Sequence, residues 1–265
     1  MADGPHSKAQ LDKLGERLRA GSSAEADLRD LDAYRRSFRA AYEFVMGSLS
    51  LFSRLERTGR PAKTPGAIID KLNRQRIRLT QIQDIAGIRL VCDHVPDQDL
   101  IVRWLGSRFP TAQLDDRRIK PSHGYRAAHV IVPTEFQRSV EIQVRTKAQD
   151  RWAQVSEKLA NLIDPGIKYG AGPKQVRRLL AVYSDAVRQS EELERQHDDM
   201  LHVAHELLQR KSDAATSAEH ERLSQAAEEL QERVRTQRGL LERSLEDMAR
   251  VALMWPRNPE EDDKS

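Results

Sequence analysis

Two acidic residues in the middle of the chain, Asp84 and Glu141, each lie beside or within a short apolar segment. Carboxylates are ligands that hard divalent cations such as Mg²⁺ prefer. Tyr125, between them, offers an aromatic face on which a nucleobase can stack. Basic side chains that can neutralise phosphate charge are interleaved with the acids: Arg89, Lys120, Arg126 and Arg145. These residue types in this order predict a site for a nucleoside triphosphate and its metal.

Three short segments with strand patterns must position these side chains. Residues 86–92 and 127–132 are rich in Ile and Val, as central strands are, and residues 140–145 alternate between apolar and polar side chains. The alternation places Glu141 and Gln143 on one face of the third strand together with Arg145. We therefore expect an α+β fold with a mixed β-sheet.

Segments with helical periodicity lie before, between and after these predicted strands. Apolar residues recur at helical spacing over residues 24–57, which predicts one long N-terminal helix. Thr64-Pro65 supplies a cap and a first-turn proline for a helix that would direct Lys71 and Arg74 inward. Further segments with helical patterns are residues 97–108 and 147–163.

Beyond a Gly-rich hinge at residues 170–173, the chain predicts a long helical hairpin with a polar turn at residues 211–217. Its second helix carries apolar residues at a mostly three-four spacing, which is typical of a coiled-coil seam. The seam consists of Leu223, Ala227, Leu230, Val234, Leu241, Leu245, Met248 and Ala252. Such a hairpin would fold back on the catalytic domain or pair with a second subunit, and we expect a homo-oligomer formed through it.

The composition favours long helices with solvated faces, because only 38% of the 265 residues are hydrophobic whereas 32% are charged. The single cysteine, Cys92, excludes a disulfide framework and predicts a buried thiol. The sequence has no run of eighteen apolar residues and no apolar signal-peptide core. We therefore expect a cytoplasmic protein with no membrane partner.

The hinge also sets the expected domain organisation. The predicted segments are a flexible N-terminus (1–23), an α+β domain (24–170), a C-terminal helical extension (171–256) and an acidic tail (257–265).

Ordered motifs between about residues 60 and 159 resemble the synthetase domain of the RelA/SpoT family, and in size the chain is similar to a small alarmone synthetase. The residues that carry the resemblance are Lys63-Thr64-Pro65 with Ile68 and Lys71, Asp84-Ile85-Ala86-Gly87-Ile88-Arg89, Gly124-Tyr125-Arg126 with His129, Glu141-Ile142-Gln143-Val144-Arg145-Thr146, and Trp152-Ala153. The resemblance implies a nucleotidyltransferase-like catalytic domain. With Mg²⁺, it would move the β,γ-diphosphate of ATP onto the 3′-hydroxyl of GDP or GTP to make (p)ppGpp.

The resemblance also implies a role for each matching residue. Asp84 and Glu141 would hold Mg²⁺, Glu141 would be the base for the attacking hydroxyl, and His129 would approach the transferred group. The ATP-binding residues would be Arg60, Lys63, Lys71, Arg74 and Arg89, with Arg89 over the adenine. The acceptor-binding residues would be Lys120, His123, Tyr125, Arg126, Gln143 and Arg145, with Tyr125 stacked on the acceptor base.

The chain departs from the family pattern at four positions. Pro61 stands where an arginine is usual, and Arg60 is expected to take that role through a one-residue shift. Ala67 removes a hydroxyl that would contact phosphate. The other two are Ser156, in a segment where Glu-His-Lys is common, and His123, where Asn or Ser is common. The change at His123 leaves the identity of the acceptor open.

Two other functions stay open. Some small members of the family are toxins that place pyrophosphate on the 3′ end of tRNA or make adenosine alarmones. Basic residues at 71–78, with Arg177 and Arg178, could hold an RNA backbone, and an antitoxin protein would then be a partner. The other class is a non-catalytic nucleotide or RNA sensor with a helical oligomerisation arm, against which two metal-binding acids argue. His197-Asp198, which could be the remnant of a hydrolase metal site, is interpreted as a solvated helix face because upstream histidines are missing.

Overall fold

The structure, a computed structural model, describes residues 7–21, 24–52, 55–209 and 214–254. The helices are α1 (Lys8–Arg19), α2 (Glu25–Arg36), α3 (Arg39–Ser48), α4 (Pro65–Gln75), α5 (Val95–Arg108), α6 (Lys147–Leu162), α7 (Lys174–Gln209) and α8 (Ala214–Met254). Short 3₁₀ helices are η1 (Leu49–Phe52), η2 (Leu79–Gln81) and η3 (Pro165–Tyr169). The strands are β1 (Glu56–Arg60), β2 (Ala86–Cys92), β3 (Gln113–Asp116), β4 (Ala128–Pro133) and β5 (Ser139–Thr146).

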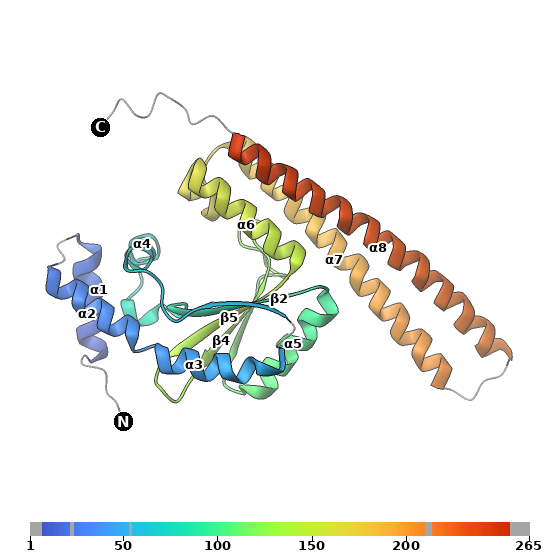
Figure 1. Cartoon of the computed structure of the whole chain (residues 1–265), viewed down its shortest axis with the longest axis horizontal. Coiled ribbons are helices and arrows are strands. Elements are labelled where there is room, and N and C mark those ends of the chain that lie inside the picture. The colour runs from blue at the N-terminus through green and yellow to red at the C-terminus, as the bar shows by residue number, and fades with distance from the viewer. Residues whose placement is uncertain (1–6, 22–23, 53–54, 210–213, 255–265) are drawn as a thin grey trace. The chain divides into compact units, whose positions relative to one another are not determined.

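The five strands form one sheet in the order β1-β2-β5-β4-β3 (Figure 1). β1 pairs antiparallel with β2, and β4 pairs antiparallel with both β3 and β5. The three central strands are the three that the sequence predicts, and their apolar side chains, such as Leu90, Val130 and Ile142, are buried. The predicted α+β fold, with a mixed sheet, flanking helices and a C-terminal helix pair, is confirmed.

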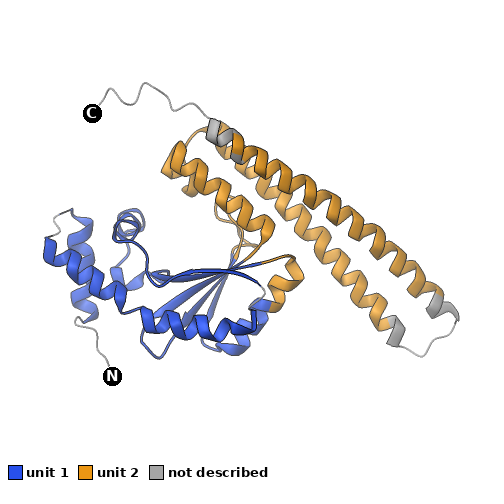
Figure 2. Cartoon of the chain, in the orientation of Figure 1, with its two compact units in different colours: residues 1–91, 101–116, 128–144 blue, residues 92–100, 117–127, 145–265 orange. Residues whose placement is uncertain are grey.

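The chain divides into two compact units (Figure 2). One contains residues 1–91, 101–116 and 128–144, and the other contains residues 92–100, 117–127 and 145–265. The predicted boundary after residue 170 does not coincide with this division. The reason is that α6 shares one hydrophobic cluster with η3, α7 and α8.

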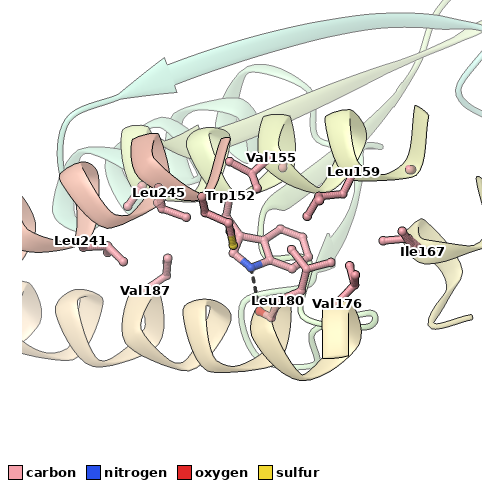
Figure 3. Packing of buried hydrophobic residues seen from close by; sticks show 13 residues of the cluster. Trp152, Val155, Leu159, Ile167, Val176, Leu180, Val187, Leu241 and Leu245 are labelled. Carbon is pink, nitrogen blue, oxygen red and sulfur yellow. Dashed lines mark hydrogen bonds between the residues drawn. The ribbon is translucent and has the colours of Figure 1, made fainter. Parts of the chain in front are cut away.

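This cluster includes three residues of the predicted coiled-coil seam, Leu241, Leu245 and Met248. Trp152, Val155 and Leu159 of α6 pack with Val187 of α7 and Leu245 of α8 (Figure 3). The seam residues that are buried are Ala227, Leu230, Val234, Leu241, Leu245 and Met248. The hairpin thus folds back on α6, which is one of the two predicted arrangements, and a homo-oligomer formed through these helices stays a prediction.

The sequence predicts a polar turn over residues 211–217, but α8 already begins at Ala214, so residues 214–217 are helical. Residues 211–213 of the predicted turn lie outside the described part of the chain.

The prediction of a flexible N-terminus is wrong for the segment that forms α1 (Lys8–Arg19). Ser7 caps this helix by accepting a hydrogen bond from the Gln10 backbone, and the Gln10 side chain accepts one from the Ser7 backbone. Leu11, Leu14 and Leu18 recur at helical spacing and are buried. An apolar stripe and a capping box are therefore the signals that reveal this helix.

The single N-terminal helix predicted over residues 24–57 is also wrong. α2 ends after Arg36, where the Ser37 hydroxyl donates to the Tyr34 carbonyl, and α3 begins at Arg39. Residues 56 and 57, the last of the predicted helix, belong to strand β1, which continues through Gly59 to Arg60. A Cβ atom on Gly59 would lie 2.4 Å from the Tyr42 hydroxyl, so only glycine lets this strand approach α3 so closely.

Cys92 is buried, and its thiol donates to the carbonyls of Arg145 (3.3 Å) and His94 (3.5 Å). Burial, together with the charge of Asp97, raises the pKa of the Cys92 thiol to about 12. Because the thiolate is the reactive form, we expect iodoacetamide at pH 8 to modify the native protein at least about a hundredfold more slowly than the urea-unfolded chain. Mass spectrometry of the alkylated peptide measures both rates, with Cys92→Ser as the blank. Equal rates would show that the thiol is accessible in the native state.

In the described ranges, none of the helices is both long enough and apolar enough to span a lipid bilayer.

Candidate active site

Asp84 lies just before β2, and two lysines hold its carboxylate. Lys63 contacts Oδ2, and Lys71 Nζ lies 2.8 Å from Oδ1. All three side chains are mostly buried, with 14 to 17% of each side chain exposed. Two cations and one anion in a low-dielectric position leave a net positive charge, which suits the binding of a polyphosphate.

The local sequence explains why the two lysines meet at Asp84. Thr64 caps α4 by accepting from the Ala67 backbone, and Pro65 occupies the first turn, so the helix begins directly after Lys63. Lys71 lies two turns further along α4. The backbone of Lys63 donates to the Ile85 carbonyl at 2.8 Å, and its carbonyl accepts from Arg35 Nε at 2.6 Å. The chain around Lys63 is therefore fixed both to the start of β2 and to α2.

Glu141 lies on β5 and is 6% exposed. Its Oε1 is 2.8 Å from His129 Nδ1, and its Oε2 accepts from Gln143 Nε2 at 2.7 Å. The register pairs His129 of β4 with Gln143 of β5, and Glu141 is two residues further along the same strand face. Strand alternation thus brings the three side chains together, as the sequence predicts for Glu141 and Gln143.

Both carboxylates are held in the ionised form. Burial raises the pKa of Asp84, but the charges and hydrogen bonds of Lys63 and Lys71 outweigh it and lower the pKa to about 2. Burial likewise raises the pKa of Glu141, and the hydrogen bond and charge of His129 bring it below its usual value. The negative charge of Asp84 raises the pKa of Glu141, so the two acids lie close enough to interact.

This donor set fits Mg²⁺. The ion usually takes one or two protein carboxylates and fills its other positions with water and substrate phosphate oxygens. Asp84 and Glu141 provide two ionised carboxylates, and each oxygen that accepts one hydrogen bond keeps a second lone pair. Among the described residues no group of three or more His, Cys, Asp or Glu side chains could enclose a metal without substrate.

The remaining predicted ATP-binding residues lie on neighbouring elements of the same unit. Arg60, at the end of β1, is exposed and directs Nη2 toward the Asp84 carbonyl at 3.5 Å. Arg89 of β2 is half-buried and lies opposite Thr58 of β1. Arg74, in the last turn of α4, is exposed. Arg60 therefore joins the cluster of Lys63, Lys71 and Asp84.

Five of the six predicted acceptor-binding residues belong to the second unit: four lie in residues 117–127, which we call the acceptor loop, and Arg145 is the fifth. Gln143, the sixth, lies beside Glu141 in the first unit. A tight turn orients Tyr125, because its backbone N–H donates to the Ser122 carbonyl at 2.9 Å. Both central residues of this turn have positive φ, 52° at His123 and 87° at Gly124, as in a type I′ turn. Gly124 is thus required by the backbone conformation.

Tyr125 is held from its hydroxyl end and over its ring. Arg145 donates to the Tyr125 hydroxyl from Nη2 at 2.8 Å and from Nε at 3.2 Å, and its Nη1 lies 2.9 Å from Asp150 Oδ1. The guanidinium carbons of Arg145 and Arg117 lie 5.0 and 5.8 Å from the centroid of the ring, within cation–π range. The arrangement fixes the orientation of the ring beside two positive charges.

The other three predicted acceptor-binding residues of the acceptor loop lie in different surroundings. Lys120 and His123 are exposed, and His123 packs against the backbone of Gly170, where a Cβ atom would lie 2.3 Å from His123 Nδ1. Arg126 is buried and donates from Nε and Nη2 to Glu191 Oε2 of α7, at 3.1 and 2.6 Å. Its guanidinium is directed to a helix of the C-terminal hairpin.

Reasoning from the sequence alone does not identify four residues that contact the predicted ATP-binding or acceptor-binding residues. They are Arg35, Arg117, Asp150 and Glu191. Asp150 is in the first turn of α6, where acids are favoured, and Arg117 is three positions before Lys120, which is predicted to bind the acceptor, so both have a local signal. Arg35 and Glu191 act on residues 28 and 65 positions away, and no pattern in the sequence links them to their partners.

Part of the chain is similar to proteins of a known family. Residues 59–160 match the family model described as a region found in RelA/SpoT proteins. The chain is 32% identical over 149 residues to the GTP pyrophosphokinase YjbM of Bacillus subtilis. The matched region covers 51% of this chain and 67% of that protein. It is 36% identical over 138 residues to the uncharacterized protein Rv1366 of Mycobacterium tuberculosis, and this match spans 47% of the chain and only half the length of the mycobacterial relative.

A solved structure shows the same fold. The small alarmone synthetase 1 of Bacillus subtilis, bound to its product pppGpp, matches with a TM-score of 0.52 and 28% sequence identity over 62% of this chain and 94% of that chain. The family match includes Lys63, Lys71, Asp84, His129 and Glu141. The chain belongs to the RelA/SpoT synthetase family.

Proposed function

We propose that the protein is a pyrophosphokinase that transfers the β,γ-diphosphate of ATP to the 3′-hydroxyl of GDP or GTP. The observation that carries this proposal is the pair of ionised, buried carboxylates: Asp84 held by Lys63 and Lys71, and Glu141 held by His129. A relative that is 32% identical is named a GTP pyrophosphokinase, which supports the choice of a guanosine acceptor.

Binding of the donor nucleotide, ATP, would depend mainly on positively charged side chains and Mg²⁺. Lys63 and Lys71 would bind the phosphates of ATP, and Arg60 would add a third cation at the edge of the cluster. Asp84 and Glu141 would hold Mg²⁺, which when bound neutralises charge on the phosphate oxygens. Catalysis of such a transfer depends mostly on positioning and on electrostatic stabilisation, which this arrangement of charges supplies.

Glu141 would act on the acceptor hydroxyl. In the transfer, the 3′-oxygen forms a bond to the β-phosphorus, the bond from that phosphorus to the α-phosphate oxygen breaks, and AMP leaves. Glu141 accepts the proton of the 3′-hydroxyl, and His129 and Gln143 keep its carboxylate in one orientation. The ionised state of Glu141 is a requirement of this role, and its lowered pKa supports it.

Tyr125 would stack on the acceptor base. We expect Tyr125→Ala to raise KM for GDP about ten- to hundredfold, because a base stacked on an aromatic ring contributes roughly 1–3 kcal/mol. Tyr125→Phe keeps the ring and loses the hydroxyl that accepts from Arg145, so its KM should rise clearly less than that of Tyr125→Ala. Initial rates at varied GDP and fixed ATP measure both variants. Equal KM values for Tyr125→Ala and the wild type would refute the stacking role.

A transfer assay tests the proposed function. The protein is incubated with Mg²⁺ and γ-labelled ATP, with GDP, GTP, ADP or bulk tRNA offered separately, and the labelled products are resolved. Label on a guanosine nucleotide is expected, and α-labelled ATP should leave its label on AMP, which separates diphosphate transfer from nucleotidyl transfer. Label on tRNA or ADP would instead identify a toxin-type enzyme. Absence of label on every acceptor would contradict catalysis and favour a nucleotide sensor.

A further inference from the structure

Helix α7 holds the acceptor loop at two points, one on each side of Tyr125. The Ser184 hydroxyl donates to the Gly124 carbonyl at 2.7 Å, and Glu191 accepts both hydrogen bonds of Arg126. Ser184 and Glu191 are seven residues apart, so they lie on the same face of α7, two turns from each other. The residue that would stack on the acceptor base is therefore flanked by two attachments to one helix.

The first attachment leaves little room for movement. A Cβ atom on Gly124 would lie 2.9 Å from Trp152 Cζ2 and 3.2 Å from Ser184 Cβ, so the turn lies directly on α6 and α7. Trp152 is itself fixed, because its Nε1 donates to the Leu180 carbonyl of α7 at 3.0 Å (Figure 3). The backbone before Tyr125 is thus packed against two helices.

The second attachment is a buried ion pair with further hydrogen bonds. The side chains of Arg126 and Glu191 are only 5% and 2% exposed. Glu191 also accepts from Gln149 Nε2 at 2.6 Å, and Gln149 in turn accepts from Gln98 at 2.8 Å. A buried ion pair adds little stability over apolar residues of the same size, but it permits only one arrangement of its partners. Its effect here would be to fix the conformation of the loop.

From these contacts we propose that Glu191 is a positioning residue for the acceptor nucleotide, which acts through Arg126 to hold Tyr125 in the orientation that stacks on the base. This inference rests on the proposed function. It also changes the expected role of Arg126, whose guanidinium is committed to Glu191 and so supports the loop instead of gripping the acceptor. Glu191 lies outside the residues 59–160 that match the family model, so the C-terminal hairpin contributes an element of its own to acceptor binding.

Glu191→Gln is the test variant, and Glu192→Gln, on the exposed side of the same helical turn, is its matched control. In Glu191→Gln we expect KM for GDP to rise about ten- to hundredfold, since small displacements of a positioning group have effects of this size. KM for ATP should change less than about twofold, because the donor residues are not touched. An unchanged KM for GDP would overturn the proposal.

Two further variants separate positioning from stability and from direct binding. Replacing both partners, Arg126→Met with Glu191→Leu, removes the ion pair without leaving a buried charge, so Tm should return close to that of the wild type. KM for GDP should nevertheless stay raised, and its return to the wild-type value would show that the pair has only a structural role. A raised KM in Arg126→Met alone, with Glu191→Gln unaffected, would show that Arg126 binds the acceptor directly.

Amide hydrogen exchange gives a readout that does not depend on activity. Residues 117–127 should exchange faster in Glu191→Gln than in Glu192→Gln, whereas α4 should be unchanged. If the wild-type protein transfers label to no acceptor, the proposed function fails, and exchange still decides whether Glu191 holds the loop. If the wild type is active and exchange in the loop is the same in both variants, only the positioning role fails.

Discussion

Replacing Glu141 with glutamine is expected to lower kcat for diphosphate transfer by about a thousandfold, because a general base typically contributes two to four orders of magnitude. Glutamine keeps the size of the side chain and one accepting oxygen, so it can retain one of the two contacts that the Glu141 oxygens make with His129 and Gln143. The loss would therefore arise mainly from the missing negative charge. Initial rates with labelled ATP at saturating GDP measure the change, and thermal unfolding checks that the fold is intact.

Glu135→Gln is the matched control, because Glu135 is an exposed glutamate in the turn between β4 and β5. Its rate should equal that of the wild type. A Glu141→Gln variant that retains more than about a tenth of the wild-type kcat would rule out Glu141 as the base.

The donor half of the candidate site could be predicted from the sequence because its signals are local. Thr64-Pro65 marks the start of α4, which brings Lys71 to the same place as Lys63, and alternation along β5 puts Glu141 and Gln143 on one face. Each of these inferences uses a period of two or 3.6 residues within one element. The position of Asp84 beside the sheet can be predicted because an apolar, buried strand begins two residues after it.

The elements that the sequence did not reveal lack such a signal. β1 and β3 are edge strands whose residues are mostly exposed and polar, so they show no apolar alternation. The helical prediction over residues 24–57 consequently extends into the first two residues of β1. The pairing of Arg126 with Glu191 joins residues 65 positions apart, and either side chain alone has the pattern of a solvated charge.

The C-terminal hairpin shows how a clear pattern can predict an element and still leave its partner open. The spacing of Leu230, Val234 and Leu241 predicts a coiled-coil seam, and a seam of this kind fits a second subunit as well as a helix of the same chain. In the structure the partners are α6 and α7, and Trp152 lies in the shared cluster. Periodicity within one helix does not encode which of these partners it packs against.

Asp84→Asn is expected to reduce transfer by about a hundred- to thousandfold while ATP still binds in the absence of Mg²⁺, because losing one metal ligand costs several kcal/mol of transition-state stabilisation. Lys63 and Lys71 lose the anion between them in this variant, so both are available to the phosphates of ATP. Transfer rates and equilibrium binding of a fluorescent ATP analogue, each with Mg²⁺ and with EDTA, measure the two effects separately. Asp70→Asn, an exposed position beside Lys71 on α4, is the matched control and should leave both unchanged.

The combination of results distinguishes a metal ligand from a charge that only orders the lysines. If Asp84 holds Mg²⁺, the asparagine variant should lose the increase in ATP affinity that Mg²⁺ gives to the wild type, while its affinity in EDTA is equal or higher. If Asp84 only keeps Lys63 and Lys71 in place, ATP binding should weaken in EDTA as well, because the unpaired ammonium groups repel each other. Full transfer activity in Asp84→Asn would remove Asp84 from the site, and Glu141 alone would then have to provide the protein carboxylate for the metal.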